Sequence, residues 1–100
     1  MSFINNALFP PFGEGVLVKK MDAKPNIGLE IKRRRAQLRI NQEELAFRSE
    51  LADSFLQNVE LGNQQLTLHT LFKVSVGLET EPEKLIHAAW ISWKANLNNK

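Results

Sequence analysis

Residues 26–97 alternate short amphipathic segments with residues that start or stop helices. Such closely spaced signals restrict this part of the chain to short helices joined by short turns. Gly62 tolerates positive φ and ends the third segment, Thr67 caps the fourth, and Pro82 suits the first turn of the fifth. The pattern predicts an all-α fold with five helices, over about 27–39, from about 42, 53–61, from about 68, and from 82 to about 97.

The second and third predicted helices carry the clearest local signals. Asn41-Gln42-Glu43-Glu44 has the form of a capping box. In this motif the side chain of Asn41 accepts a hydrogen bond from a backbone amide of the first turn, and the side chain of Glu44 bonds the backbone amide of Asn41. We expect the third helix to begin near Asp53 and to end at Gly62. Its inward residues are Phe55, Leu56 and Val59, and the fourth helix carries Leu68, Leu71, Phe72 and Val76.

The chain is predicted to contain one domain with an extension at each end. Phe9-Pro10-Pro11-Phe12-Gly13 and Lys24-Pro25 disfavour helix, so residues 1–25 are interpreted as an irregular N-terminal arm. Residues 16–18 are a candidate short strand, and Met21 is a candidate internal start. Residues 26–86 form the predicted domain, and residues 87–100 extend its last helix.

Composition excludes several classes of protein. The 100 residues include no cysteine, which rules out disulfides and thiolate metal sites. No apolar run reaches the roughly 18 residues of a membrane span, and the N-terminus lacks the basic region of a secretory signal, so we expect a cytoplasmic protein. Basic residues concentrate between 19 and 39 and acidic residues between 40 and 82, a distribution that favours nucleic acid only weakly.

An enzyme is not expected. His69 and His87 are far apart in the sequence and lie in predicted helices, where packing or surface roles are commoner than catalysis. The chain has no glycine-rich phosphate loop and no nucleophile motif. We therefore expect neither a catalytic site nor a metal or cofactor.

Residues 35–46, 51–62 and 63–68 together resemble phage-repressor-like helix-turn-helix regulators of the Xre, Cro and cI type. The last of these segments, Asn63-Gln64-Gln65-Leu66-Thr67-Leu68, is most similar to restriction–modification controller proteins. The resemblance covers about 60 of the 100 residues and includes the terminal Glu60-x-Gly62 of the recognition helix. It implies a five-helix lambda-repressor-like DNA-binding domain, here with an extended C-terminal helix and an irregular N-terminal arm.

This resemblance makes residues 53–61 the recognition helix, which lies in the major groove in such proteins. Short polar side chains at its start face base edges there. Asn58 or Gln57 can pair bidentately with adenine, and Asp53 can accept a bond from cytosine N4. The alternative is an ordinary solvated helix face. The predicted base-reading residues are Asp53, Ser54, Gln57 and Asn58.

The resemblance also assigns backbone contacts and an ion pair. It places Gln42 on a phosphate at the start of the second helix, where free amides and the helix dipole favour anions, although an exposed helix-start residue is the alternative. It places Asn63 and Gln64 on the backbone beyond the third helix. Arg35 and Glu60 occupy the positions of a structural ion pair. Arg33 and Arg34 are further candidates for phosphate contact.

Four positions depart from the resemblance. Arg39, Glu50 and Glu79 stand where the family often has glycine, so each is strained if its backbone needs positive φ. Ala52 replaces the usual Ser or Thr cap of the recognition helix. The stripe of Trp90, Trp93 and Leu97 extends beyond the family's usual end, and we interpret it as a dimer interface, with a tail folded onto its own core as the alternative.

The sequence as a whole predicts a homodimeric transcriptional regulator that binds a near-palindromic operator in double-stranded DNA. The resemblance makes regulation of a restriction–modification operon plausible. The alternative is a protein-interaction module or an antitoxin built on the same fold. The apolar arm around Phe3, Leu8, Phe9 and Phe12 and the two tryptophans favour that alternative.

Overall fold

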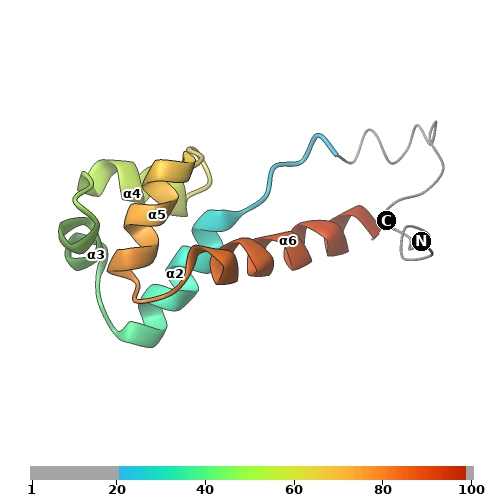
Figure 1. Cartoon of the computed structure of the whole chain (residues 1–100). Coiled ribbons are helices and arrows are strands. Elements are labelled where there is room, and N and C mark those ends of the chain that lie inside the picture. Colours follow the sequence, from blue (N-terminus) through green and yellow to red (C-terminus); the bar gives the residue numbers. More distant parts are fainter. Residues whose placement is uncertain (1–20, 99–100) are drawn as a thin grey trace.

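The computed structural model describes residues 21–98, and this part of the chain is entirely helical and irregular, without strands. In Figure 1, four short helices gather into one body, and the last helix extends from it as a long rod. The predicted five-helix, all-α fold is confirmed. The helices are α2 (Ile27–Leu38), α3 (Gln42–Ser49), α4 (Asp53–Glu60), α5 (Leu68–Gly77) and α6 (Pro82–Asn98).

The predicted arm lies mostly outside the described residues. Phe3, Leu8, Phe9 and Phe12, together with the candidate strand at 16–18, belong to this undescribed part. None of the helices within residues 21–98 has the length and hydropathy needed to cross a membrane.

Side-chain caps start three of the helices. The side-chain oxygens of Asn26, Asn41 and Thr67 accept bonds from the backbone amides three residues further on, which satisfies otherwise unpaired donors. The capping box at α3 is only half formed. The carboxylate of Glu44 does not reach back to Asn41, because it accepts a 3.0 Å charge-assisted bond from Arg48 one turn along the helix.

Three helices end at non-glycine residues in the left-handed region. The φ angles of Arg39, Glu50 and Glu79 are 59°, 55° and 54°. These are the positions at which the sequence predicts strain. The backbone amides of Arg39 and Glu50 bond carbonyls in the last turns of α2 and α3, so the left-handed residue closes each helix.

Replacing Glu50 by glycine is expected to raise the free energy of unfolding by about 0.5–1 kcal/mol. The left-handed conformation costs an L-residue about 1–2 kcal/mol, and the greater freedom of glycine in the unfolded chain offsets part of that gain. Glu50→Gln is the control, because it removes the charge and keeps the strain. Urea titration measures the free energies of unfolding of the two variants. Equal values for Glu50→Gly and Glu50→Gln would show that the backbone at this position is not strained.

The core lies where α2, α3, α4 and α5 meet. Ile31, Leu45, Leu56, Val74 and Leu78 are fully buried there. Of the four apolar residues that mark the fourth helix in the sequence, only Leu71 is buried. The helix packs on α3 through the face that carries Val74 and Ser75, which turns the other three outward: Leu68, Phe72 and Val76 are 64%, 47% and 74% exposed.

Helix α2 approaches α4 closely because Gly28 has no side chain. A Cβ at this position would overlap the carbonyl oxygen of Val59 and approach the Cα of Glu60. The contact fixes the start of α2 against the last turn of α4. The position of α4 relative to α2 is thereby fixed.

Candidate nucleic-acid interface

Helix α4 has one apolar and one polar face. Leu56 and Val59 are buried in the core, whereas the four predicted base-reading residues are all exposed. Their spacing of one, three and one residues places them on one side of the first turn and a half. The structure thus brings together, on one outward face, Asp53, Ser54, Gln57 and Asn58.

The first turn of α4 has no side-chain cap. Ala52 precedes it in an extended conformation, and among the described residues no side chain accepts from its first amides. The neighbouring residues Asp53 and Ser54 therefore do not substitute for the missing cap. The first amides stay available to an outside acceptor at the positive end of the helix dipole.

The start of α3 lies beside the polar face of α4. A shallow hollow between the two helices is lined by Asn41 and Gln42 on one side and by Asp53 and Gln57 on the other. The predicted phosphate contact at Gln42 thus adjoins two of the predicted base-reading residues. This grouping is a property of the tertiary fold, since 10 residues lie between Gln42 and Asp53 in the sequence and 14 between Gln42 and Gln57.

The ion pair expected between Arg35 and Glu60 is present and joins α2 to the end of α4. Arg35 donates two bonds of 2.8 Å, one to each carboxylate oxygen of Glu60, and a third of 3.0 Å to the carbonyl of Ile40. The side chain of Glu60 is only 4% exposed. Gln42 donates a 2.9 Å bond to the same carboxylate. The network therefore holds the start of α3 against the end of α4.

The environment of Glu60 lowers its pKa. Burial raises the pKa, but the hydrogen bonds from Arg35 and Gln42 and the positive charge of Arg35 outweigh burial. Lys32 adds a smaller effect in the same direction, which places its charge near the end of α4. Lys32 is not among the phosphate candidates predicted from the sequence, and its charge near Glu60 makes it a further candidate. Its spacing of three residues from Arg35, on the same side of α2, is the signal that could have identified it.

Stability is expected to fall in acid because of Glu60. A carboxylate with a lowered folded pKa stabilises the protein fully above its unfolded pKa of about 4.3, and this contribution is lost as the pH falls through the folded value. The destabilisation caused by Glu60→Gln should therefore be largest at neutral pH and shrink below about pH 4. Urea titrations at pH 7, 5, 4 and 3 measure this difference. A difference that does not change with pH would contradict the assignment.

The two arginines predicted to contact phosphate have different surroundings. Arg33 is exposed and forms a 2.8 Å ion pair with Glu30 in the preceding turn. Arg34 instead bonds the carbonyls of Leu78 and Glu79 at 3.0 and 2.9 Å, and also Gln37. A guanidinium whose donors are used on the end of α5 has a structural role. Arg34 therefore caps that helix end, and the phosphate contact expected of it stays a prediction.

Asn63 and Gln64 lie in the exposed loop that follows α4. The backbone amide of Asn63 donates a 2.8 Å bond to the carbonyl of Asn58, which fixes the loop to the last turns of the helix. Gly62, at φ 85°, makes the turn between them. The side chains of Asn63 and Gln64 are both exposed.

Comparison with known proteins agrees with this geometry. A helix-turn-helix family profile matches residues 31–85, which include α3, the turn and α4. The chain belongs to the helix-turn-helix family. It is therefore a DNA-binding regulator of the type that the sequence resembles. No curated protein sequence matches the chain at a significant level.

Two solved structures resemble this helix-turn-helix protein. One is the restriction–modification controller protein C.AhdI from Aeromonas hydrophila, which is 32% identical, with a TM-score of 0.58 over 60% of this chain and 91% of that one. The other is a variant of the restriction–modification controller protein C.Esp1396I. It is 25% identical, with a TM-score of 0.62 over 68% of this chain and 86% of that one.

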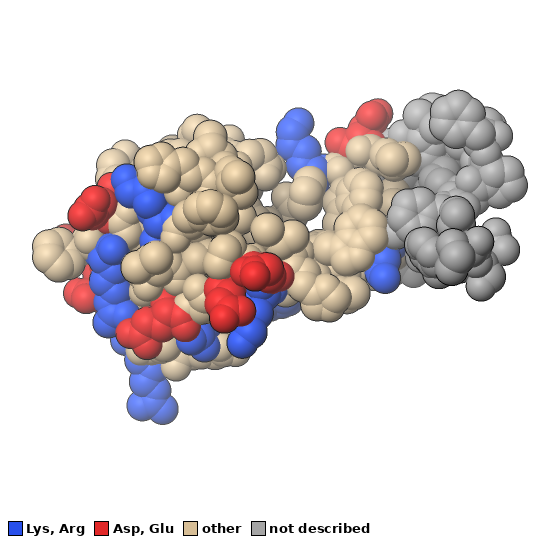
Figure 2. Space-filling view, in the orientation of Figure 1, with Lys and Arg blue, Asp and Glu red and all other residues tan. Residues whose placement is uncertain are grey.

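Charges of both signs are interspersed over the helix-turn-helix body. Figure 2 shows Lys and Arg side chains alternating with Asp and Glu on the visible face, rather than a separate basic patch. Ion pairs account for part of this pattern, since Arg48 bonds both Glu44 and Glu79.

The residues predicted to form a dimer interface lie on α6. Trp90 is 36% exposed and stacks on Trp93 with ring centroids 5.9 Å apart. Trp93 donates a 2.6 Å bond from Nε1 to the carbonyl of Ala23. Leu97 is only 4% exposed in the single chain. Trp90 therefore offers a partner more surface than Leu97, and the interface stays a prediction.

Proposed function

We propose that the protein is a transcriptional regulator that binds a near-palindromic operator as a homodimer, with residues 53–61 in the major groove. The observation that carries this proposal is the polar face at the start of α4. Leu56 and Val59 anchor the helix in the core, so its outward side chains are presented on a rigid element.

The four outward side chains supply complementary bonds to base edges. Gln57 and Asn58 each offer one donor and one acceptor, the pair that adenine N7 and N6 require. Asp53 accepts from cytosine N4, and the hydroxyl of Ser54 bonds either kind of edge. These side chains can therefore distinguish base pairs by hydrogen bonds to their edges, which attraction to the phosphate charge cannot do.

Contacts to the sugar–phosphate backbone are proposed from α2, from the start of α3 and from the loop after α4. Gln42 lies at the start of α3, where backbone amides and the helix dipole favour an anion. Asn63 and Gln64 follow the last residue of α4, and Arg33 and Lys32 add positive charge from α2. Such contacts fix the register of the protein on the duplex and carry no sequence information.

The homodimer is supported by apolar surface on α5 and α6, which pack against each other. Leu68, Phe72 and Val76 form an exposed stripe along α5, and Trp90 is the most accessible of the predicted interface residues. Large apolar side chains exposed in a row along one helix are typical of an interaction surface. Two subunits joined there would present two recognition helices to half-sites about one helical turn, ~34 Å, apart.

Control of restriction–modification genes is the proposed biological role, on the basis of the likeness to C.AhdI and C.Esp1396I. The alternative role is a protein-interaction module or antitoxin on the same fold. The exposed stripe on α5 favours it as well, because the stripe can hold a different protein instead of a second copy.

Selection of binding sites from a pool of random duplexes tests the proposal. The purified chain is expected to enrich a two-fold-related motif whose halves are one helical turn apart. Mobility shifts at two salt concentrations should then show tighter binding to this motif than to random DNA, with two chains per duplex. Failure to enrich any sequence would contradict operator recognition and favour the protein-interaction role.

A further inference from the structure

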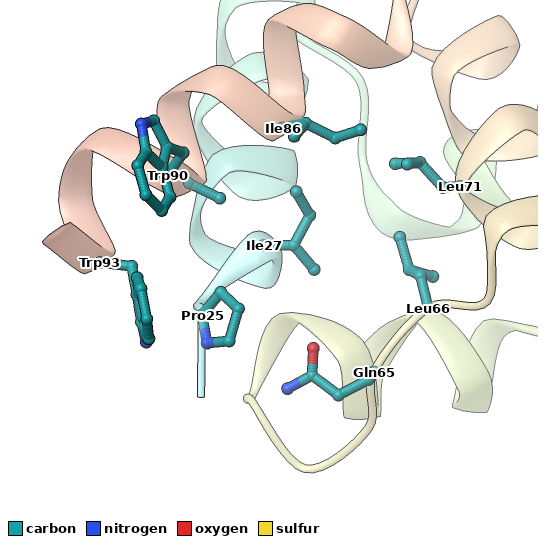
Figure 3. A pocket seen from close by; sticks show the side chains of 9 residues that line it. Pro25, Ile27, Gln65, Leu66, Leu71, Ile86, Trp90 and Trp93 are labelled. Atoms are coloured by element: carbon teal, nitrogen blue, oxygen red, sulfur yellow. The ribbon is translucent and has the colours of Figure 1, made fainter. Parts of the chain in front are cut away.

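An apolar groove of about 270 Å³ lies between α6, the start of α2 and the loop before α5. Figure 3 shows Trp90 and Trp93 on one wall, Pro25 and Ile27 in the middle, and Gln65 and Leu66 on the opposite wall. Ile86 and Trp90 are 47% and 36% exposed, so the groove is open to its surroundings.

The groove is better suited to side chains of a polypeptide than to a small-molecule effector. Ligand sites generally have volumes of about 300–1,000 Å³ and several polar groups that orient the ligand. Here Gln65 is the one uncharged polar side chain among otherwise apolar lining residues, and no charged residue lines the groove. A groove with two tryptophans and a proline instead resembles the aromatic-lined grooves that bind extended, proline-containing segments.

The N-terminal arm, residues 1–25, ends at the wall of this groove. Pro25 and Ile27 line the groove, and the 2.6 Å bond from Trp93 Nε1 to the carbonyl of Ala23 fixes the chain just before them. Any segment upstream is therefore tethered beside the groove. A short flexible tether gives an effective concentration of the order of millimolar, which makes even a weak contact within one chain competitive.

The sequence of the arm matches the chemistry of the groove. Phe9-Pro10-Pro11-Phe12 places two aromatic rings on either side of two prolines. Proline fixes φ and favours an extended conformation, so little backbone entropy is lost on binding. Twelve residues separate Phe12 from Pro25, enough to span up to ~40 Å when extended, so the segment can fold back.

We propose that residues 9–12 of the arm bind in the groove of the same chain and contact Trp90 and Trp93. The arm then covers apolar surface on α6 and attaches the long helix to the helix-turn-helix body. This inference does not depend on the proposed base reading, because none of the groove residues belongs to α3 or α4. It leaves Leu68, Phe72 and Val76 on α5, rather than Trp90, as the exposed surface for a second copy.

Tryptophan fluorescence of the full chain is the first test. The protein has two tryptophans and no tyrosine, so its emission reports on the groove alone. Replacing Phe9 and Phe12 together by serine should raise the acrylamide quenching constant about twofold, because the indole faces lose the phenyl rings that cover them. The circular-dichroism helix signal should not change. An unchanged quenching constant would overturn the proposal.

Disulfide trapping is the second test, and the absence of native cysteine gives it no background. Leu8→Cys combined with Gln65→Cys should form a disulfide within one chain, because the Cα atoms must come within about 7 Å. Leu8→Cys with His87→Cys is the matched control, since His87 is exposed on α6 but does not line the groove. Equal trapping of the two pairs, or a disulfide between two chains, would overturn the assignment.

Discussion

Replacing Ser54 and Asn58 together by alanine should lower operator affinity about 10²–10³-fold, because each base-edge contact contributes about 1–3 kcal/mol. Affinity for random DNA should change little, since phosphate contacts supply most of it. Both side chains are exposed and alanine favours helix, so the fold should be retained. Mobility shifts with operator and random duplexes, on the wild type and the variant, measure the two affinities.

The chain provides a matched control for this variant. Ser92 and Asn96 have the same residue types and the same spacing of four, and both are exposed on α6. Replacing them by alanine should leave operator affinity unchanged. If the Ser54 and Asn58 variant retained wild-type operator affinity, α4 would not be the reading element.

Replacing Glu60 by leucine should destabilise the fold by about 3–5 kcal/mol, because it leaves the guanidinium of Arg35 largely buried without its partner. The side chain of Arg35 is only 15% exposed. Gln42 loses its acceptor as well. Urea titration followed by circular dichroism measures the change.

Two further variants separate pair loss from other causes. Adding Arg35→Met to Glu60→Leu should recover most of the loss, since an apolar pair of similar volume is often no less stable than a buried ion pair. Glu44→Leu is the control for an exposed pair and should cost at most about 1 kcal/mol. If Glu60→Leu also cost at most about 1 kcal/mol, the hydrogen-bonded network around Glu60 would not be important for stability.

Local signals explain why most helix boundaries were predictable. Asn41, Thr67 and Pro82 act through their own backbone neighbourhood, so a single sequence is enough to place them. The left-handed residues Arg39 and Glu50 were found by comparison with the glycines of the family. The exception is Glu44, whose bond depends on a competition between Asn41 and Arg48 that spacing alone does not decide.

Long-range contacts were less predictable. Arg34 caps the end of α5 across 44 residues, and nothing in the local sequence distinguishes it from Arg33. The exposed side of α5 depends on how that helix rotates against α3, so Phe72 and Val76 could not be assigned to the surface in advance. The bond from Trp93 to Ala23 spans 70 residues, and neither residue type predicts it.

Methylation protection on the selected operator tests the central claim, that α4 reads the major groove. Dimethyl sulfate modifies guanine N7 in the major groove and adenine N3 in the minor groove, so one experiment distinguishes the two. Guanine N7 should be protected at two sites one helical turn apart, and this protection should be lost in the Ser54 and Asn58 variant. Protection confined to adenine N3, or none at concentrations that saturate binding, would contradict it.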